Sequence, residues 1–376
     1  MDVNHKISAP TDREDGGNGS PAPPARSDIG RRPPTIADVA RLAGVSQATV
    51  SYVMNGRNRV GDETKQKVRK AIAALNYQPH SAAQSLASQH VGSIGLVIPH
   101  SPDDVFADPF FPELMRGIGR AADRHRNTLV FSMTKGAHVY DQAEAIARSR
   151  RADGLIVVDP GEDSSRIVDL VSQGEKVLVI GRQREPGLCY VDVDNEGGAY
   201  QAARHLLAFA APGRRIAIIA GPERQPASND RLVGYRRGIE SMGLDPADAL
   251  VVHGRFTEES GYECMQGLLK DHEQYLVLAA NDLMAIGAMR AVSEAGLAIG
   301  RDVKLVGFDD VSYCRFVTPP LTTVRQPVGE LGERAAETLI TWLKTGRPPE
   351  ATILPVQLVV RRTCGCTDGA GPQSDN

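Results

Sequence analysis

The 376-residue sequence has few cysteines, few aromatic residues and no long apolar runs, and each shortage excludes a class of protein. Five cysteines, an odd number in a long chain, argue against a disulfide framework and favour reduced thiols. The apolar runs are only as long as a strand, so no transmembrane helix is predicted. The N-terminal residues lack the apolar core of a secretory signal. We therefore expect a cytoplasmic protein with no membrane partner.

Enzyme motifs are also missing. The sequence has no G-x-G-x-x-G after a strand, no Walker phosphate loop, no H-E-x-x-H and no G-x-S-x-G. The nine histidines are scattered, and Cys364 and Cys366 have no second Cys/His pair at zinc spacing. The sequence thus predicts no catalytic residues, no cofactor and no metal site.

Charge is distributed unevenly along the chain, whose formal net charge is −3. Residues 35–90 carry seven Lys or Arg and three acids, a net +4, whereas residues 1–34 carry five of each sign. The sequence from Val91 onward therefore totals −7. A small basic segment on an acidic body indicates a polyanionic partner for that segment, although charge alone also fits a solvated helix face.

Residues 35–54 predict two short helices joined by a turn. Thr35 and Ser46 are suitable N-caps, and Gly44 permits the turn between them. The second helix keeps small and polar residues on its outer side: Gln47, Ala48, Ser51 and Tyr52. Such a pair forms either a helix-turn-helix, whose second helix enters the major groove of DNA, or an ordinary helical hairpin. A third helix is expected over residues 62–77.

After Val91 the pattern changes to apolar, β-branched runs separated by amphipathic stretches. Strands are predicted at 93–99, 128–133, 154–160, 176–181, 190–194, 215–221, 275–282 and 303–310, and helices at 112–126, 228–242, 258–270 and 284–295. Buried runs that alternate with helices form parallel sheets covered on both faces. This part of the chain is too long for one ordinary open sheet, so we expect two doubly wound lobes.

Short motifs follow in a fixed order along almost the whole chain. They include "TIADVA", "ATVSYVMNG", "LNYQPHSAAQSLAS", "IGLVIP", "DPFFPELMRGI", "ADGLIVV", "LAANDLMAIGAMRA", "GFDDV" and "PPLTTVRQP". In this order they resemble the lactose/galactose-repressor (LacI/GalR) family of bacterial transcription regulators. The resemblance implies a small all-α helix-turn-helix DNA-binding domain and an α/β two-lobed sensor domain like a periplasmic binding protein. It also implies a homodimeric repressor that binds a near-palindromic operator in double-stranded DNA under the control of a small-molecule effector.

The resemblance assigns DNA contacts to the helical segment. Contacts that position the DNA backbone are expected from Thr35, Ser46, Thr49, Ser51 and Asn55. Gln47, Ala48 and Tyr52 are expected to face bases, since Gln pairs with adenine edges and an Ala methyl packs on thymine. Many relatives have an arginine at the position of Tyr52, so base preference there does not carry over.

Residues 80–91 resemble the hinge helix and linker of the family, a segment that enters the minor groove as a pair. Leu86 matches the leucine that wedges between base steps and kinks the duplex; a core leucine is the alternative. The expected domains are a disordered tail (1–34), the DNA-binding domain (35–79), the hinge (80–91), the sensor and dimerisation domain (92–363) and a disordered tail (364–376). No leucine heptads follow Arg362, so no added tetramerising helix is expected.

Several predicted strands end in polar residues: Asp159, Arg182, Asn281, Asp282, Asp309 and Asp310. Ligands of open α/β sheets bind beyond the carboxyl ends of the strands, and carboxylates and amides there suit a hydroxyl-rich ligand. Helix capping is the alternative for some of these positions. The resemblance places effector contacts at Phe111, Asp159, Arg231, Phe256, Asn281 and Asp309. A sugar or sugar derivative is expected rather than a purine, because Gln225 and Pro226 stand where purine sensors have an arginine-rich loop.

Two other classes of protein share part of this pattern. A periplasmic sugar-binding protein would have the two-lobed body, but it needs a signal peptide and no DNA module. A sugar kinase fused to a helix-turn-helix would need a loop that cradles phosphate. The sequence therefore favours a non-enzymatic DNA-binding regulator.

Overall fold

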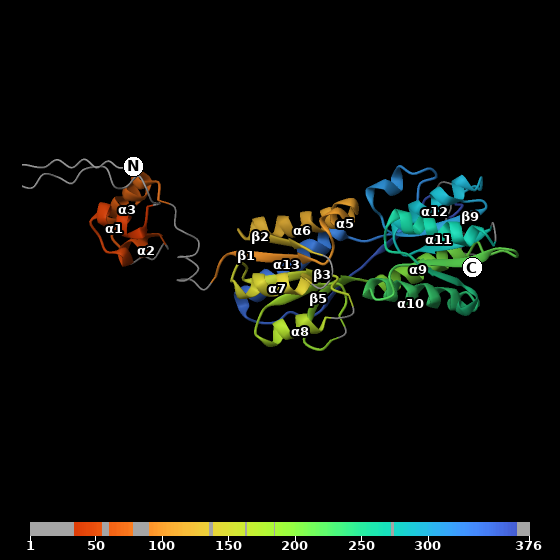
Figure 1. Ribbon diagram of the computed structural model, residues 1–376, viewed down its shortest axis with the longest axis horizontal. Helices are drawn as coiled ribbons and strands as arrows, with labels where there is room; N and C mark the ends of the chain where they lie inside the picture. Colours follow the sequence, from red (N-terminus) through yellow and green to blue (C-terminus); the bar gives the residue numbers. More distant parts are fainter. Residues whose placement is uncertain are drawn as a thin grey trace, which may run out of the picture. The chain divides into compact units, whose positions relative to one another are not determined.

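The computed structural model describes residues 34–54, 60–77, 90–134, 138–161, 164–183, 185–271 and 274–366. The chain divides into two compact units, Met1–Ala87 and Ser88–Asn376. The described residues of the first unit are helical, and the second unit contains two sheets (Figure 1). Asn55, Leu86 with most of the predicted hinge, and nearly all of both predicted tails lie outside the described residues. None of the helices in the described part of the chain has both the length and the apolar character needed to cross a membrane.

The described part of the first unit consists of α1 (Ile36–Ala43), α2 (Gln47–Met54) and α3 (Asp62–Leu75). Val39, Val50 and Val68, one from each helix, are fully buried in a shared core. Thr35 is the N-cap of α1, and its backbone N–H and its hydroxyl donate to the Asp38 carboxylate at 2.9 and 2.7 Å. The predicted cap and the pairing of Thr35 with Asp38 are both present.

The turn between α1 and α2 also follows the prediction. Gly44 ends α1 in the left-handed conformation (φ 66°), which an L side chain rarely adopts. Ser46 then accepts a 3.1 Å hydrogen bond from the backbone N–H of Thr49 at the start of α2. Side-chain capping of this kind satisfies an N–H group that has no partner within the helix.

The second unit contains two six-stranded sheets. The sheet of the N-lobe has the order β11-β5-β4-β3-β1-β2 and consists of β1 (Ser93–Ile98), β2 (Thr128–Met133), β3 (Gly154–Val158), β4 (Val177–Ile180), β5 (Cys189–Val193) and β11 (Thr352–Leu354). The sheet of the C-lobe has the order β12-β10-β9-β8-β6-β7 and consists of β6 (Arg215–Ala220), β7 (Leu250–His253), β8 (Tyr275–Ala279), β9 (Val303–Asp309), β10 (Thr322–Arg325) and β12 (Gln357–Val359). Among the described strands only β10 and β12 pair antiparallel. The prediction of two doubly wound lobes is confirmed.

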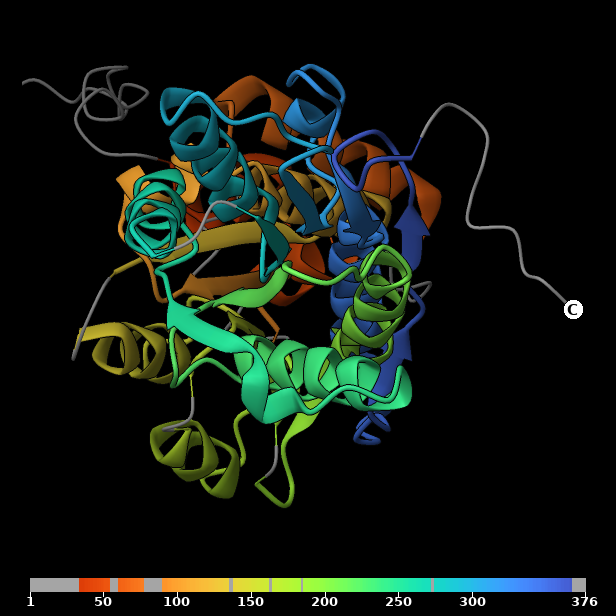
Figure 2. The same ribbon diagram turned by 90° about the vertical axis from the view of Figure 1, so that its right-hand side faces the viewer.

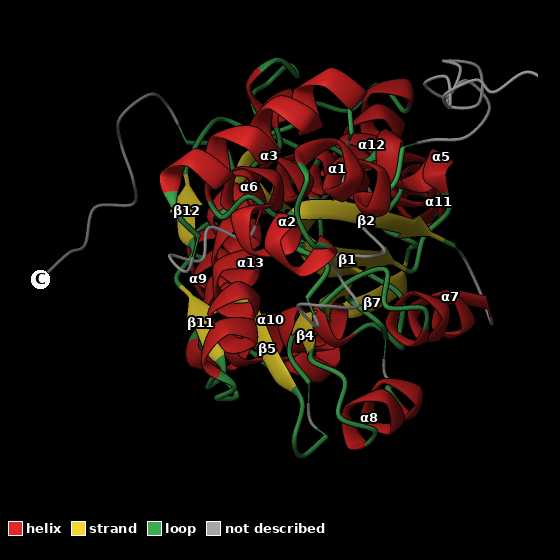
Figure 3. Ribbon diagram, turned by 90° about the vertical axis from the view of Figure 1, so that its left-hand side faces the viewer, coloured by secondary structure: helices red, strands yellow, loops and turns green. Residues whose placement is uncertain are grey.

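Helices cover both faces of the N-lobe sheet (Figure 3). They are α6 (Phe110–Arg124) and α13 (Val328–Thr345) on one face and α7 (His138–Arg148) and α8 (Ser165–Ser172) on the other, with the short α5 (Pro102–Ala107) before α6. Neighbouring strand residues point to opposite faces. Accordingly, Ile156 joins the core on the α6 and α13 side, and Val157 joins the core on the α7 and α8 side.

The C-lobe repeats this arrangement (Figure 2). Its helices are α9 (Asn195–Leu207) and α10 (Pro226–Ser241) on one face and α11 (Glu258–Leu269) and α12 (Asp282–Glu294) on the other, with short 3-10 turns at Pro246–Asp248 and Ser312–Arg315. Ile218 of β6 packs on the α9 and α10 side, and Ile219 packs on the α11 and α12 side. Each lobe therefore has an apolar core on both faces of its sheet.

The chain passes between the lobes at three points, and a polar residue lies at two of these crossings. It passes from β5 to α9, from β10 to α13 and from β11 to β12. Asn195 lies at the first of these crossings and Gln326 at the second. Side chains at these positions can contact both lobes.

Candidate functional site

Polar side chains from several elements of the sensor unit gather where β3, β8 and β9 end. Asp159 follows β3, Asn281 follows β8 and caps α12, and Asp309 is the last residue of β9. Arg231 lies on α10 and is only 6% exposed. Of the strand-end positions predicted from the sequence, Asp159 and Asp309 therefore lie near one buried cation.

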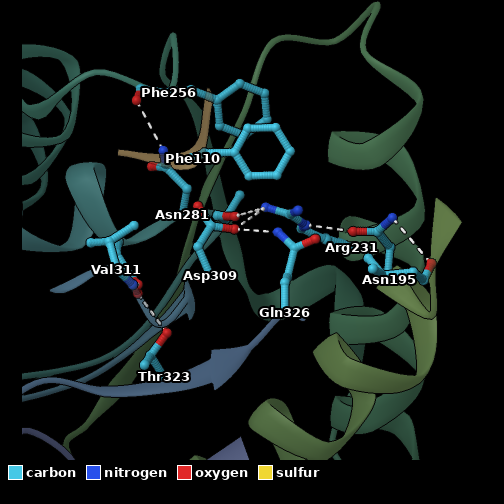
Figure 4. Close-up of polar contacts among 12 residues, drawn as sticks. Phe110, Asn195, Arg231, Phe256, Asn281, Asp309, Val311, Thr323 and Gln326 are labelled. Carbon is cyan, nitrogen blue, oxygen red and sulfur yellow. Dashed lines mark hydrogen bonds and ion pairs between the residues drawn. The ribbon is translucent and has the colours of Figure 1, made fainter. Parts of the chain in front are cut away.

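The Arg231 guanidinium is held by acceptors from three elements (Figure 4). Its Nε donates to Asn195 Oδ1 at 2.9 Å, and its Nη1 donates to the backbone carbonyl of Ala280 at 2.5 Å and lies 3.5 Å from Asp309 Oδ1. The guanidinium also stacks on Phe308, 3.9 Å from the ring centroid. Among the described residues none accepts a hydrogen bond from Nη2.

The partners of Arg231 form further hydrogen bonds with residues near the two crossings between the lobes. Gln326 donates from Nε2 to Asp309 Oδ1. On the other side, Asn195 donates from Nδ2 to Asp192 Oδ1 at 3.2 Å. Asp192 is on β5 of the N-lobe, so a continuous polar network joins the two lobes through Arg231.

A second pair of contacts joins the lobes beside this network. Arg182, just after β4, approaches Asp230 of α10, with 3.4 Å between Nε and Oδ2. Asp159 faces Gln225, whose amide donates to both carboxylate oxygens at 3.0 Å when its nitrogen is turned toward them. Charged and polar groups of the N-lobe therefore meet α10 and the residue before it.

The carboxyl groups around Arg231 are shifted toward the neutral form. Burial, with a smaller contribution from the charge of Asp192, raises the pKa of Asp159 to about 7. Burial also raises the pKa of Asp192 to about 6 and that of Asp108, in the loop before α6, above its ordinary value. The pKa of Asp309 lies well above its ordinary value because burial outweighs the opposing charge of Arg231. Arg231 therefore lies among several buried carboxyl groups, and Asp159, with a pKa of about 7, can both donate and accept hydrogen bonds near neutral pH.

Phe256 is positioned by Asn281 and by a glycine. Asn281 Nδ2 donates to the Phe256 carbonyl at 2.9 Å, while Oδ1 accepts from the backbone N–H of Met284 at 3.0 Å. The backbone of Phe256 has a φ of +62°, which is strained for a side chain of this size. Its ring lies so close to Gly221 that an added Cβ there would be 2.3 Å from the ring. Asn281 therefore caps a helix and positions Phe256, with both ends of its amide in use.

Phe111 has different surroundings. It is 8% exposed, belongs to the N-lobe core and packs against His100 and Phe110. Phe110, the first residue of α6, is less buried, and Figure 4 draws its ring on the same side of the Arg231–Asp309 pair as Phe256. The helix begins two residues before the predicted start, so Phe110 also belongs to it.

Two of the strand-end acids have structural partners. Asp282 is fully buried and accepts hydrogen bonds from Val311 N, Cys314 Sγ and Thr323 Oγ1. Asp310 forms ion pairs with Arg325 and Arg361. Helix capping and internal pairing thus account for some strand-end residues, as the alternative interpretation allowed.

Three polar members of the network were not predicted from the sequence: Asp192, Asn195 and Gln326. Asn195 follows a strand in "YVDVDN", which resembles the Asn and Asp residues after β8 and β9. Gln326 has no comparable signal, because only the fold shows that the segment after β10 crosses between the lobes.

The helical unit presents the outer face of α2 to solvent. Gln47 and Ala48 are exposed and Tyr52 is 37% exposed, while Val50 is fully buried on the opposite side. The side chains of Ser46 and Thr49 hydrogen-bond to each other at 2.9 Å. Among the described acids of the unit, Asp62 and Glu63 pair with Lys65 and Lys67 on the surface, and the buried Asp38 contacts Arg41.

Comparisons with known proteins match both units. A model of bacterial regulatory proteins of the lacI family matches residues 35–80, and a model of a periplasmic binding protein-like domain matches residues 203–364. The HTH-type transcriptional regulator CelR of Thermobifida fusca is 33% identical over 339 residues, which cover 89% of this chain and 99% of CelR. The HTH-type transcriptional repressor PurR of Edwardsiella ictaluri is 32% identical over 335 residues, which cover 88% of this chain and 96% of PurR.

Solved structures agree with these matches. A lac repressor dimer bound to operator and the anti-inducer ONPF gives a TM-score of 0.77 at 29% identity, covering 89% of this chain and 99% of that one. A complex of CelR with cellobiose gives a TM-score of 0.66 at 31% identity, covering 88% of this chain and 99% of that one. Both similarities extend over the helical unit and the sensor unit.

Proposed function

Because this chain belongs to the lacI family of bacterial regulatory proteins, we propose that the effector controlling it is a sugar bound in the sensor unit beside Arg231, Asp309 and Phe256. The protein is a DNA-binding transcriptional regulator under effector control and not an enzyme. It is a repressor in this proposal, as PurR is by name.

The observation that carries the sugar proposal is that an aromatic ring lies beside hydrogen-bond donors and acceptors. Phe256 supplies a ring face, and an apolar face of a pyranose stacks on such a ring. Arg231 has Nη2 left for a ligand oxygen, and Asp159 and Asp309 supply carboxyl groups. A sugar hydroxyl both donates and accepts, which matches carboxyl groups whose pKa values are raised.

The complex of CelR with cellobiose supports a sugar rather than a purine. Gln225, which stands where purine sensors have an arginine-rich loop, faces Asp159. In our proposal Asp159 and Arg231 bind the ligand directly, and Asn281 acts by holding Phe256 in place. Phe111 supports the ligand-facing ring of Phe110.

Calorimetric titration of the full chain tests the sugar proposal. The panel consists of cellobiose, other disaccharides, common monosaccharides, and guanine and hypoxanthine. At least one sugar is expected to bind and to change the affinity for operator DNA, and the purines are expected not to bind. Binding of a purine with no response to any sugar would refute the proposal.

For DNA, we propose that α2 enters the major groove with Gln47, Ala48 and Tyr52 toward the bases. Thr35, Ser46, Thr49, Ser51 and Asn55 contact the DNA backbone in this proposal. The exposure of Gln47 and Ala48 and the burial of Val50 support this orientation of the helix. Mapping of binding sites across the source genome, with and without the sugar, identifies the operator.

We also propose that the chain acts in the cytoplasm as a homodimer on a near-palindromic operator, with residues 80–91 as the hinge. The structure of the lac repressor on its operator is of a dimer, which supports this arrangement. Leu86 then enters the minor groove from each chain and kinks the duplex. Leu86→Ala is expected to reduce the DNA bend and leave effector binding intact; an unchanged bend would remove Leu86 from the interface.

The position of the polar network suggests how effector binding could affect DNA binding. Asn195 and Gln326 are on the crossings between the lobes and both contact the Arg231–Asp309 pair. An effector that binds Arg231 therefore acts on residues whose geometry depends on how the lobes are arranged. It shifts the equilibrium between lobe arrangements only by its difference in affinity for them.

A further inference from the structure

The last described residues of the chain form a cluster that the regulatory function does not use. Cys364 and Cys366 belong to the sequence "CGC" after β12, and His205 is in the last turn of α9. Their ligand atoms, two Sγ and one imidazole nitrogen, all lie within 4.8 Å of one another. The Sγ of Cys366 is 3.9 Å from Nε2 of His205, which is 161 positions earlier in the chain.

The backbone of Gly365 brings the two thiols together. Gly365 has a φ of +86°, and its N–H donates to the Arg362 carbonyl at 3.0 Å. A Cβ at this position would be 1.9 Å from Nζ of Lys304 and 2.6 Å from the Gly300 carbonyl oxygen. Only glycine both adopts this positive φ readily and leaves room for Lys304 and Gly300. The tight turn between the two cysteines therefore requires Gly365.

The cluster is partly shielded from water. Cys364 is fully buried in the core beneath α9 and α10, and Cys366 and His205 are half-buried. Thr322 donates from its hydroxyl to Cys364 Sγ at 3.3 Å, and the His205 ring packs edge-on against Phe209. The donor atoms are therefore held in place before any ligand arrives, which reduces the entropy that binding costs.

We infer that Cys364, Cys366 and His205 form a binding site for one thiophilic metal ion, Cu⁺ or Zn²⁺. Thiolate and imidazole ligands suit both ions. Lys304 Nζ donates to the Gly300 and Cys364 carbonyls at 2.9 and 3.3 Å, so its positive charge lies beside the thiolates. Cu⁺ with two thiolates has a net charge of −1, which Lys304 offsets, whereas Zn²⁺ with two thiolates is neutral and needs a fourth ligand such as water.

The site has a structural consequence, because it cross-links the C-terminal segment to α9. Asn195, at the other end of α9, accepts the hydrogen bond from Arg231. Metal binding is expected to stabilise the C-lobe, since a ligand that binds only the folded state raises its stability. The sequence did not predict this site because His205 is remote from the cysteines and only the fold brings them together.

Competition for metal on the reduced full chain tests this inference. Zn²⁺ is titrated against a chromophoric chelator, and Cu⁺ against bicinchoninate without oxygen. One equivalent of at least one ion is expected to bind per chain and to raise the melting temperature. Substitution by Co²⁺ is expected to give sulfur-to-cobalt charge-transfer absorption if zinc is the ion.

The variants avoid the fully buried Cys364. Cys366→Ser and His205→Gln are expected to lose the bound equivalent and the metal-dependent rise in melting temperature, while both keep the far-ultraviolet circular dichroism of the parent. Cys264→Ser, which changes a half-buried cysteine on α11 outside the cluster, is expected to bind metal as the parent does. Equal binding by the parent and Cys366→Ser would overturn the site. So would failure of the reduced parent to take up either ion.

Discussion

Asn195 accepts a 2.9 Å hydrogen bond from Nε of Arg231, and this contact links the first crossing between the lobes to the central cation of the sensor site. Asn195 holds Asp192 of β5 with the nitrogen of the same amide. Arg231 in turn contacts Asp309, which Gln326 of the second crossing also binds. The side chains proposed to bind the ligand therefore belong to the same network that joins the two lobes.

Replacement of Arg231 tests this shared role. Arg231→Ala is expected to abolish the effector response and to lower the free energy of unfolding by about 3–5 kcal/mol, because it leaves buried carboxyl and amide groups without their cation. The measurements are sugar titration and chemical denaturation. Arg236→Ala, an exposed arginine on the same helix, is the control and is expected to change neither. A stable Arg231→Ala protein with a normal response would contradict both the site and the network.

Phe256 is expected to contribute a stacking face. Phe256→Ala is expected to weaken sugar binding by about 1 kcal/mol or more, roughly fivefold or more in affinity, because the ring face is lost. Calorimetric titration measures the change. Phe316→Ala removes a phenylalanine that is 81% exposed and serves as the control. If both variants bind the sugar equally well, Phe256 does not contact the ligand.

The sequence predicted the central strands well because they are buried on both faces. Runs such as "GLIVV" of β3 and "YLVLA" of β8 are apolar throughout, as parallel strands between two layers of helices must be. The strands not predicted, β7, β10, β11 and β12, are short or partly polar, and three of them lie at sheet edges. Such segments carry too little periodicity to be recognised.

For the site, the predictable part consists of residues at strand ends. Asp159, Asn281 and Asp309 could be predicted because the carboxyl ends of parallel strands meet at one edge. Their roles could not, since the sequence left open whether a residue such as Asn281 caps a helix or contacts a ligand.

Two exposed glutamines, Gln47 and Gln66, provide a test of DNA recognition and its control. Gln47→Ala is expected to cost about 1–3 kcal/mol on the operator and little on random DNA, because it removes a base contact and leaves phosphate contacts in place. Gln66→Ala, on the exposed side of α3, is expected to affect neither DNA. Binding isotherms at one fixed salt concentration make the comparison. An equal loss on operator and random DNA would show that Gln47 does not discriminate bases.

The raised pKa of Asp159 predicts how stability depends on pH in the absence of effector. Its pKa is 3.8 in the unfolded chain and about 7 in the folded protein, where burial favours the neutral form. Between these values the folded state retains a proton that the unfolded state has lost, so the free energy of unfolding falls as pH rises from about 4 to 7. Asp192, with a pKa of about 6, acts in the same direction but only up to about pH 6.

The interval from pH 6 to 7 is used to measure the contribution of Asp159 by comparison with a variant, because Asp309, whose pKa also lies well above its ordinary value, acts in the same direction in both proteins. Denaturant midpoints measured across it are expected to fall for the parent and to fall less for Asp159→Asn, because an amide does not titrate. Asp169→Asn, an exposed aspartate on α8, is expected to follow the parent. Parallel profiles for the parent and Asp159→Asn in this interval would mean that Asp159 is already ionised in the folded state at pH 6. In that case Asp159 would meet a sugar hydroxyl only as an acceptor.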